Sequence, residues 1–172
     1  MATWKNDAEA AGFAEEHLIY ELRSLRHAAQ QMGAADQATE NMAVESFALH
    51  LRNWEDFFYP PTNPRPDDVT YLDYVDRTAT PPWQPRPCSP QLTTASGMAG
   101  KQIAHITKQR YPGGHPAKNW NSRWAFEIYA LLCALAQNAN LARLPEVVRR
   151  EFLAAPGDLP TTGATGIIPP TL

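Results

Sequence analysis

The chain has 172 residues, of which 44% are apolar and 19% are charged, and its formal net charge is −3. This length and composition predict one globular domain and argue against wholesale disorder. No apolar run approaches the roughly 20 residues of a membrane span, and the N-terminus lacks the basic-then-apolar order of a signal peptide. Two cysteines are too few for a disulfide framework or a cysteine zinc site. We therefore expect a cytoplasmic protein with no membrane association.

Charge is distributed unevenly along the chain. Residues 1–76 hold five Lys/Arg and fourteen Asp/Glu, whereas residues 77–172 hold ten and four. This segregation suggests an anion-facing surface or a contact between unlike faces of two copies. Packing of the acidic half beside the basic half within one bundle explains it equally well.

A long helix is predicted from Asp7 to Met32. Asn6 or Asp7 can cap its start, and Gly33 ends it. Its apolar stripe follows helical spacing and consists of Leu18, Leu22, Leu25, Ala29 and Met32. The opposite face is predicted to be solvated and carries Glu15, Glu16, Glu21, Arg23 and Arg26. On it, His17 and Glu21 are expected to make a surface contact rather than to bind a metal.

A second helix, from Asp36 to about Tyr59, is predicted to lie at the centre of the fold. One face is apolar and consists of Val44, Phe47, Ala48, Leu51, Trp54 and Phe58. Met42, Leu49 and Phe57 lie on the opposite side. A helix that is apolar on two sides is expected to be sandwiched between neighbours.

Residues 60–90 contain nine prolines and are predicted to form a strap across the bundle rather than long regular structure. Within the strap, Asp67 to Val75 is predicted to form one short helix. The segment from Thr80 to Pro87 is expected to be extended and pinned to the bundle by Trp83.

Three more helices are predicted after the strap. Ser89 and Pro90 form a helix-start signature, and an apolar stripe continues from there to Arg110. Asn119 or Asn121 is expected to cap the next helix, which is apolar almost all round. Pro145 opens a short last helix that contains Val147, Val148, Phe152 and Leu153. No strand pattern of useful length is present.

These patterns predict an all-α fold, an antiparallel up-and-down helical bundle of four main helices plus short helices and the proline-rich strap. Residues 1–154 are expected to form a single domain. Residues 155–172 contain four prolines and three glycines and are predicted to be a flexible tail.

The sequence lacks the common motifs for metals and nucleotides. It has no Glu-x-x-His, no His-x-x-x-His, no phosphate-binding glycine loop and no Gly-x-Ser-x-Gly. Neither a metal nor a cofactor is therefore expected.

The second predicted helix carries one candidate binding set. Ser46, His50 and Asn53 share a face, and Arg52 lies beside them but is directed to another side. Polar groups on a sandwiched helix are partly buried and need partners. We favour a hydrogen-bonded network that fixes helix register, and the alternative is a ligand- or RNA-binding site.

The helix that begins at Pro90 carries a second set, Lys101, His105, Lys108 and Arg110. His105 lies away from the apolar stripe and shares its side with the two lysines. Neighbouring cations lower the pKa of a histidine, so His105 is expected to be largely neutral near pH 7 and able to act as a general base. Lys101 or Arg110 could then hold a phosphate. Metal-free RNA cleavage requires these groups, but an exposed polar face with one histidine explains the pattern equally well.

Three segments, in this order, resemble small bacterial all-helical proteins. They are Glu45–Phe58 (ESFALHLRNWEDFF), Asp67-Asp68-Val69 and Lys101–Arg110 (KQIAHITKQR). The order is similar to that of the HEPN superfamily, helical bundles that often dimerise. The resemblance implies either a metal-independent endoribonuclease of bacterial stress or phage defence, or a non-catalytic partner protein.

The HEPN motif is an arginine followed, after four to six residues, by a histidine on a helix. Ahead of His105 these positions hold Met98, Ala99 and Gly100, and the nearest cation is Lys101. Arg110 and His115 have the motif spacing, but Pro112-Gly113-Gly114 lies between them. The active motif is therefore incomplete.

Two classes of function follow. The first is a HEPN-like protein that binds or cleaves RNA, with His105, Arg110 and Lys101 as catalytic candidates and His50, Arg52, Asn53 and Lys108 as binding candidates. The second is a non-catalytic module that forms a homodimer and binds a protein partner. A small-ligand pocket among Trp54, Phe57, Trp120 and Trp124 is a further alternative.

Overall fold

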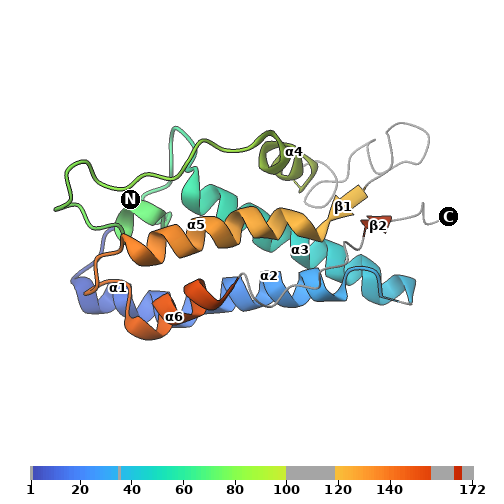
Figure 1. Ribbon diagram of the computed structural model, residues 1–172, viewed down its shortest axis with the longest axis horizontal. Coiled ribbons are helices and arrows are strands. Elements are labelled where there is room, and N and C mark those ends of the chain that lie inside the picture. The colour runs from blue at the N-terminus through green and yellow to red at the C-terminus, as the bar shows by residue number, and fades with distance from the viewer. Residues whose placement is uncertain (1, 35, 100–118, 156–164, 168–172) are drawn as a thin grey trace.

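The computed structural model describes residues 2–34, 36–99, 119–155 and 165–167. Within these ranges the chain is predominantly helical (Figure 1), and this confirms the predicted all-α class. None of the helices in these ranges is long and apolar enough to cross a membrane.

One long helix opens the fold and has three parts, α1 (Asp7–Phe13), the π turn η1 (Ala14–Leu18) and α2 (Ile19–Gln31). Asn6 caps it, because its side chain accepts a 2.9 Å hydrogen bond from the backbone N–H of Glu9. Gly33 follows it with a φ of 88°, a conformation that glycine adopts without strain. The predicted apolar stripe is buried. The π turn was not predicted.

The helix α3 (Gln37–Phe58) packs along α2 and also contacts α4 and α5. Asp36 caps it through a 2.9 Å bond from the N–H of Thr39. The predicted inner face is fully buried, and so is Phe57 on the other side, which packs against Tyr74 of the strap. Met42 and Leu49 are 64% and 55% exposed, so the prediction of a helix sandwiched along its length is wrong at these two positions. On this side of α3, Tyr74 of the strap packs against Phe57 near the C-terminal end.

The strap after α3 contains the short 3₁₀ helix η2 (Tyr71–Asp73), where a longer helix was expected. Thr70 and Asp73 form a reciprocal capping box that fixes this turn. Trp83 is half-buried and packs against the core, as expected of a residue that pins the strap to the bundle. Its ring also lies edge-on to Tyr71 of the strap, at 5.8 Å. Trp4 donates a 3.2 Å bond from Nε1 to Asp73 and so fastens the N-terminus to the strap.

The strap is also joined to the loop that follows α5. Val75 and Ala139 form an isolated antiparallel bridge. The N–H of Asp76 donates a 2.9 Å hydrogen bond to the carbonyl of Asn138. The N–H of Asn140 donates a 2.8 Å hydrogen bond to the carbonyl of Tyr74.

The helix α4 (Pro90–Met98) begins at the predicted cap, since Ser89 Oγ accepts a 3.1 Å bond from the N–H of Leu92. Its apolar residues Leu92, Ala95 and Ala99 are buried. The predicted continuation to Arg110 lies outside the described residues.

The remaining elements are β1 (Asn119–Asn121), η5 (Ser122–Trp124), α5 (Ala125–Gln137), α6 (Glu146–Ala154) and β2 (Thr165–Ile167). Asn121 caps η5 as predicted, accepting a 2.9 Å bond from the N–H of Arg123. In α6, Val148 and Phe152 are buried, whereas Val147 and Leu153 are largely exposed. β1 and β2 pair antiparallel over three residues, a ladder too short for an alternating pattern to predict.

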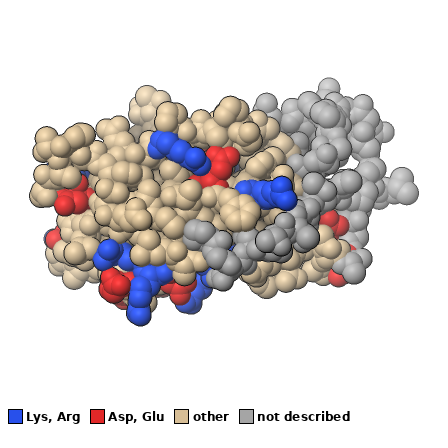
Figure 2. Space-filling model, viewed as in Figure 1, with Lys and Arg blue, Asp and Glu red and all other residues tan. Residues whose placement is uncertain are grey.

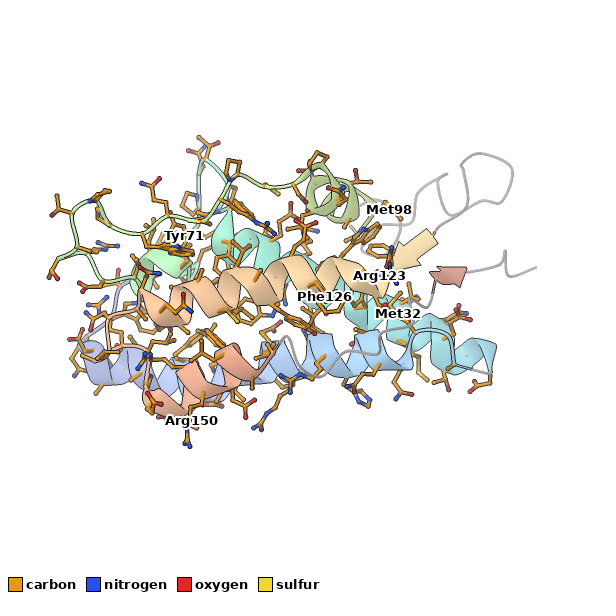
Figure 3. All side chains as sticks on the ribbon, in the orientation of Figure 1. Met32, Tyr71, Met98, Arg123, Phe126 and Arg150 are labelled. Carbon is orange, nitrogen blue, oxygen red and sulfur yellow. The ribbon has the colours of Figure 1, made fainter. Side chains whose placement is uncertain are left out.

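In Figure 1, α3 and α5 run the same way, because the strap carries the chain back along the molecule between them. The strap is thus a long crossover connection. The third main helix of the predicted up-and-down bundle, from Pro90 to Arg110, lies only in part within the described residues. α1 and η2 lie at one end of the molecule, and β1 and β2 lie at the other. Figure 3 marks these ends with Tyr71 on the strap and with Met98 and Arg123.

Ion pairs join the acidic first half of the chain to the second half. Arg143 Nε lies 2.6 Å from Asp7, and Arg23 lies 2.6 Å from Glu151. Figure 2 shows one face of the molecule, with charged side chains gathered over α6 and a smaller group around α5 and the strap. The smaller group includes the pair Arg86–Glu127, at 3.5 Å.

Candidate functional site

A cavity of about 250 Å³ opens between the long helix, the C-terminal half of α3 and the strap. The long helix contributes four of its lining residues, α3 contributes three and the strap contributes one. They are Phe13, His17, Leu18 and Glu21, then Asn53, Trp54 and Phe57, and finally Val69.

The π turn lies in the part of the long helix that lines the cavity. In η1 the N–H of Ile19 bonds to the carbonyl of Ala14, five residues back, so the turn is wider than an α-helical turn. Phe13, His17 and Glu21 are spaced four residues apart, share one side of the helix and line the cavity. π turns of this kind occur often at functional sites.

A hydrogen-bonded network holds Glu21 in the cavity wall. His50 Nδ1 lies 2.7 Å from Glu21 Oε2, and Asn53 Nδ2 donates to the same oxygen at 3.1 Å. Because an ionised carboxylate only accepts hydrogen bonds, we assign the proton of this contact to His50 Nδ1. His50 is 6% exposed, and Tyr20 lies edge-on to its ring. The network joins α2 to α3, as a register-fixing network would.

Aromatic rings form most of the remaining wall. Phe13 contacts His17 at 4.5 Å between ring centroids, and Trp54 contacts Phe57 at 5.3 Å in an edge-to-face arrangement. Trp4 packs edge-on against Phe13 and supports it from behind. Trp54 is 1% exposed, and its Nε1 has no hydrogen-bond partner in the described part of the chain. The wall is thus mainly apolar, with His17, Glu21 and Asn53 as its polar side chains.

A second cavity, of about 240 Å³, adjoins the first, since Asn53, Phe57 and Val69 line both. Its other lining residues include two carboxylates, Asp56 and Asp68. Burial raises the pKa of Asp56, and the nearby charge of Asp68 raises it further, while Arg52 opposes the shift. Arg52 Nε lies 3.7 Å from Asp56 Oδ2.

The structure separates the predicted binding residues. His50 and Asn53 meet at Glu21, whereas Arg52 points to another side, as predicted, and pairs with Asp56. Ser46 lies nearer the N-terminus of α3, in a separate pocket that it shares with His27 and Met42. The predicted catalytic residues Lys101, His105 and Arg110, together with Lys108, lie outside the described residues.

The predicted pocket of four aromatic residues divides into two clusters. Trp54 and Phe57 line the cavity, but Trp120 packs against Phe47 and Trp124, two turns away along α3. The sequence prediction of a single pocket among them is therefore wrong.

The sequence analysis missed Glu21 as a site residue and assigned it to a solvated face. Its side chain is only 24% exposed, because it lies against His50 and Asn53. The available signal was the spacing of Phe13, His17 and Glu21, which repeats every four residues and matches the spacing of Asn53 and Phe57 on α3.

Neither cysteine lines either cavity. Cys88 and Cys133 are free and half-buried, and burial raises the pKa of each thiol, which disfavours the nucleophilic thiolate. Among the described residues, no group of three or more His, Cys, Asp or Glu side chains is arranged to hold a metal ion.

No protein-family model, curated protein or solved structure shows significant similarity to this chain. We therefore base the functional inference on the fold and the cavity alone. The molecule is a helical bundle with an aromatic cavity whose polar wall carries a fixed carboxylate.

Proposed function

We propose that the protein is a small-ligand-binding helical bundle whose site is the cavity between the π turn, α3 and the strap. The observation that carries this proposal is the fixed carboxylate in an aromatic wall, since two side chains of α3 hold Glu21 at the edge of a cavity of about 250 Å³. Ligand sites are typically apolar clefts with a few well-placed polar groups. The volume suits a small molecule or one end of a larger one.

A cavity-filling substitution tests this function. Val69→Phe adds bulk to the cavity from the strap side, and Val147→Phe adds the same bulk to an exposed position on α6. We expect ligand-observed NMR to detect aromatic fragments that bind the wild-type protein and the Val147→Phe control but not Val69→Phe. Circular dichroism establishes that each variant is folded. Absence of fragment binding to the wild type, or equal binding to Val69→Phe, would rule the proposal out.

RNA binding or cleavage remains a separate proposal, carried by the HEPN resemblance and by Lys101, His105 and Arg110. The described binding candidates do not strengthen it, because His50 and Asn53 bond to a carboxylate and Arg52 is paired with one. Its test is incubation with total RNA in EDTA. Cleavage by the wild type that is lost in His105→Ala would support the enzyme, and equal cleavage by both proteins would remove it.

A further inference from the structure

Carboxylates line both adjoining cavities. Glu21 lies in the first, which His17 also lines, and Asp56 and Asp68 lie in the second. Among the described residues, no Lys or Arg lines either cavity, and Arg52 pairs with Asp56 from outside them. The carboxylates therefore outnumber the basic side chains around the shared wall formed by Asn53, Phe57 and Val69.

Glu21 is positioned to receive one more partner. Both of its described hydrogen bonds, from His50 and Asn53, go to Oε2. Within the described part of the chain, neither bond uses Oε1. Because the carboxylate is held in place, a ligand would not have to bear the entropic cost of ordering this side chain.

Aromatic rings lie on the other side of the same cavity. Phe13, Trp54 and Phe57 contribute to its wall. Rings of this kind attract cations through their quadrupole, and they also accommodate hydrocarbon. A carboxylate that faces aromatic rings is complementary to a positively charged group attached to an apolar one.

We infer that the cavity selects small organic cations, in which an ammonium group pairs with Glu21 and an attached aromatic or alkyl group lies among Phe13, Trp54 and Phe57. This inference rests on the proposed ligand-binding function. The second cavity, with Asp56 and Asp68, accommodates a further amine when the ligand is longer. An anionic ligand is disfavoured, because both cavities repel it.

Three probes of nearly equal size test the selectivity. Phenethylammonium, 2-phenylethanol and 3-phenylpropionate share a phenyl ring and differ in the charge of the head group. We expect calorimetric titration at pH 7.5 to give the ammonium compound an affinity about tenfold above that of the alcohol. The carboxylate should bind most weakly, and the preference should shrink at high salt because salt screens the partly exposed carboxylates.

Glu21→Gln then assigns the selectivity to one residue. Its amide oxygen still accepts hydrogen bonds, so His50 and Asn53 keep a partner while the charge is lost. We expect this variant to lose most of the preference for phenethylammonium and to retain the affinity for 2-phenylethanol. Glu16→Gln removes an exposed carboxylate from the same helix outside the cavity and should behave as the wild type does.

The outcomes separate this inference from the proposed function. Equal affinity for the ammonium compound and the alcohol, or tighter binding of the carboxylate, would overturn the cation selectivity and leave ligand binding intact. An unchanged preference in Glu21→Gln would also overturn the inference. If neither the three probes nor any aromatic fragment binds the wild-type protein, both the ligand-binding function and the cation selectivity are ruled out.

Discussion

At the scale of single residues, Glu21 shows what a helical wheel cannot predict. A wheel places a carboxylate opposite the apolar stripe and so assigns it to solvent. His50 and Asn53, the partners of Glu21, belong to another helix, and the residue spacing along the first helix does not indicate them. The sequence did predict that His50 and Asn53 need partners, because the helix that carries them was expected to be sandwiched. It could not supply the partner's identity, since that depends on how the two helices pack.

Glu55 is a second half-buried carboxylate on α3, and it gives a prediction about pH. Burial raises its pKa, although a hydrogen bond from Ser96 opposes the shift. A carboxyl whose pKa is higher in the folded state destabilises the fold as pH rises from its ordinary pKa through the raised one. Glu55→Gln removes this titration and keeps an acceptor for Ser96.

We therefore expect Glu55→Gln to raise the melting temperature by a few degrees at pH 7.5 and by less at pH 4. Glu45→Gln, an exposed carboxylate on the same helix, is the matched control and should show no such trend. Differential scanning calorimetry at both pH values measures the difference. A lower melting temperature for Glu55→Gln at pH 7.5 would show that the charged form is stabilised in the fold.

At the scale of elements, the sequence predicted the two longest helices well. Their ends carry local signals, namely the capping side chains of Asn6 and Asp36 and the glycine at position 33. The π turn has no comparable signal, because a single wide turn leaves the apolar spacing on either side almost unchanged. The shared face of Phe13, His17 and Glu21 follows from their four-residue spacing, whereas the turn itself could not be predicted from the sequence.

The two sides of α3 give a matched pair of substitutions. Leu51 is 2% exposed and Leu49 is 55% exposed on the same helix. Leu51→Ala should lower the free energy of unfolding by about 2–5 kcal/mol, because it leaves a hole in the core. Leu49→Ala should change it by less than about 0.5 kcal/mol. Urea unfolding monitored by circular dichroism measures both, and similar losses for the two variants would contradict the observed orientation of the helix.

At the scale of the whole molecule, the sequence predicted the all-α class and the proline-rich strap, but not the path of the strap. Up-and-down packing was expected because most connections are short. The proline-rich strap is the exception, and it returns the chain so that α3 and α5 run the same way (Figure 1). Prolines predict the absence of a helix there, but they do not determine which way the chain travels.

Association between copies is the prediction that belongs to this scale. The acidic first half and the basic second half of the chain could face each other across a two-fold axis in a homodimer, with the helix that is predicted to carry His105 near that axis. If charges hold such a dimer, salt should weaken it. Sedimentation velocity at tens of micromolar, at low and at high salt, measures this. A monomer under both conditions would exclude the dimer.

The bridge between Val75 of the strap and Ala139 has a consequence for how the fold opens. It joins segments far apart in sequence, and Trp4 and Arg143 join the same region to the start of the long helix. These parts should therefore unfold as one cooperative unit rather than fray separately. In hydrogen exchange, the amides of Asp76 and Asn140 should exchange together and slowly, whereas the amide of Asp68, which bonds only to nearby Arg65 within the strap, should exchange early. Slow exchange of the Asp76 and Asn140 amides, which lie outside any helix, would then show that this end of the molecule is still folded.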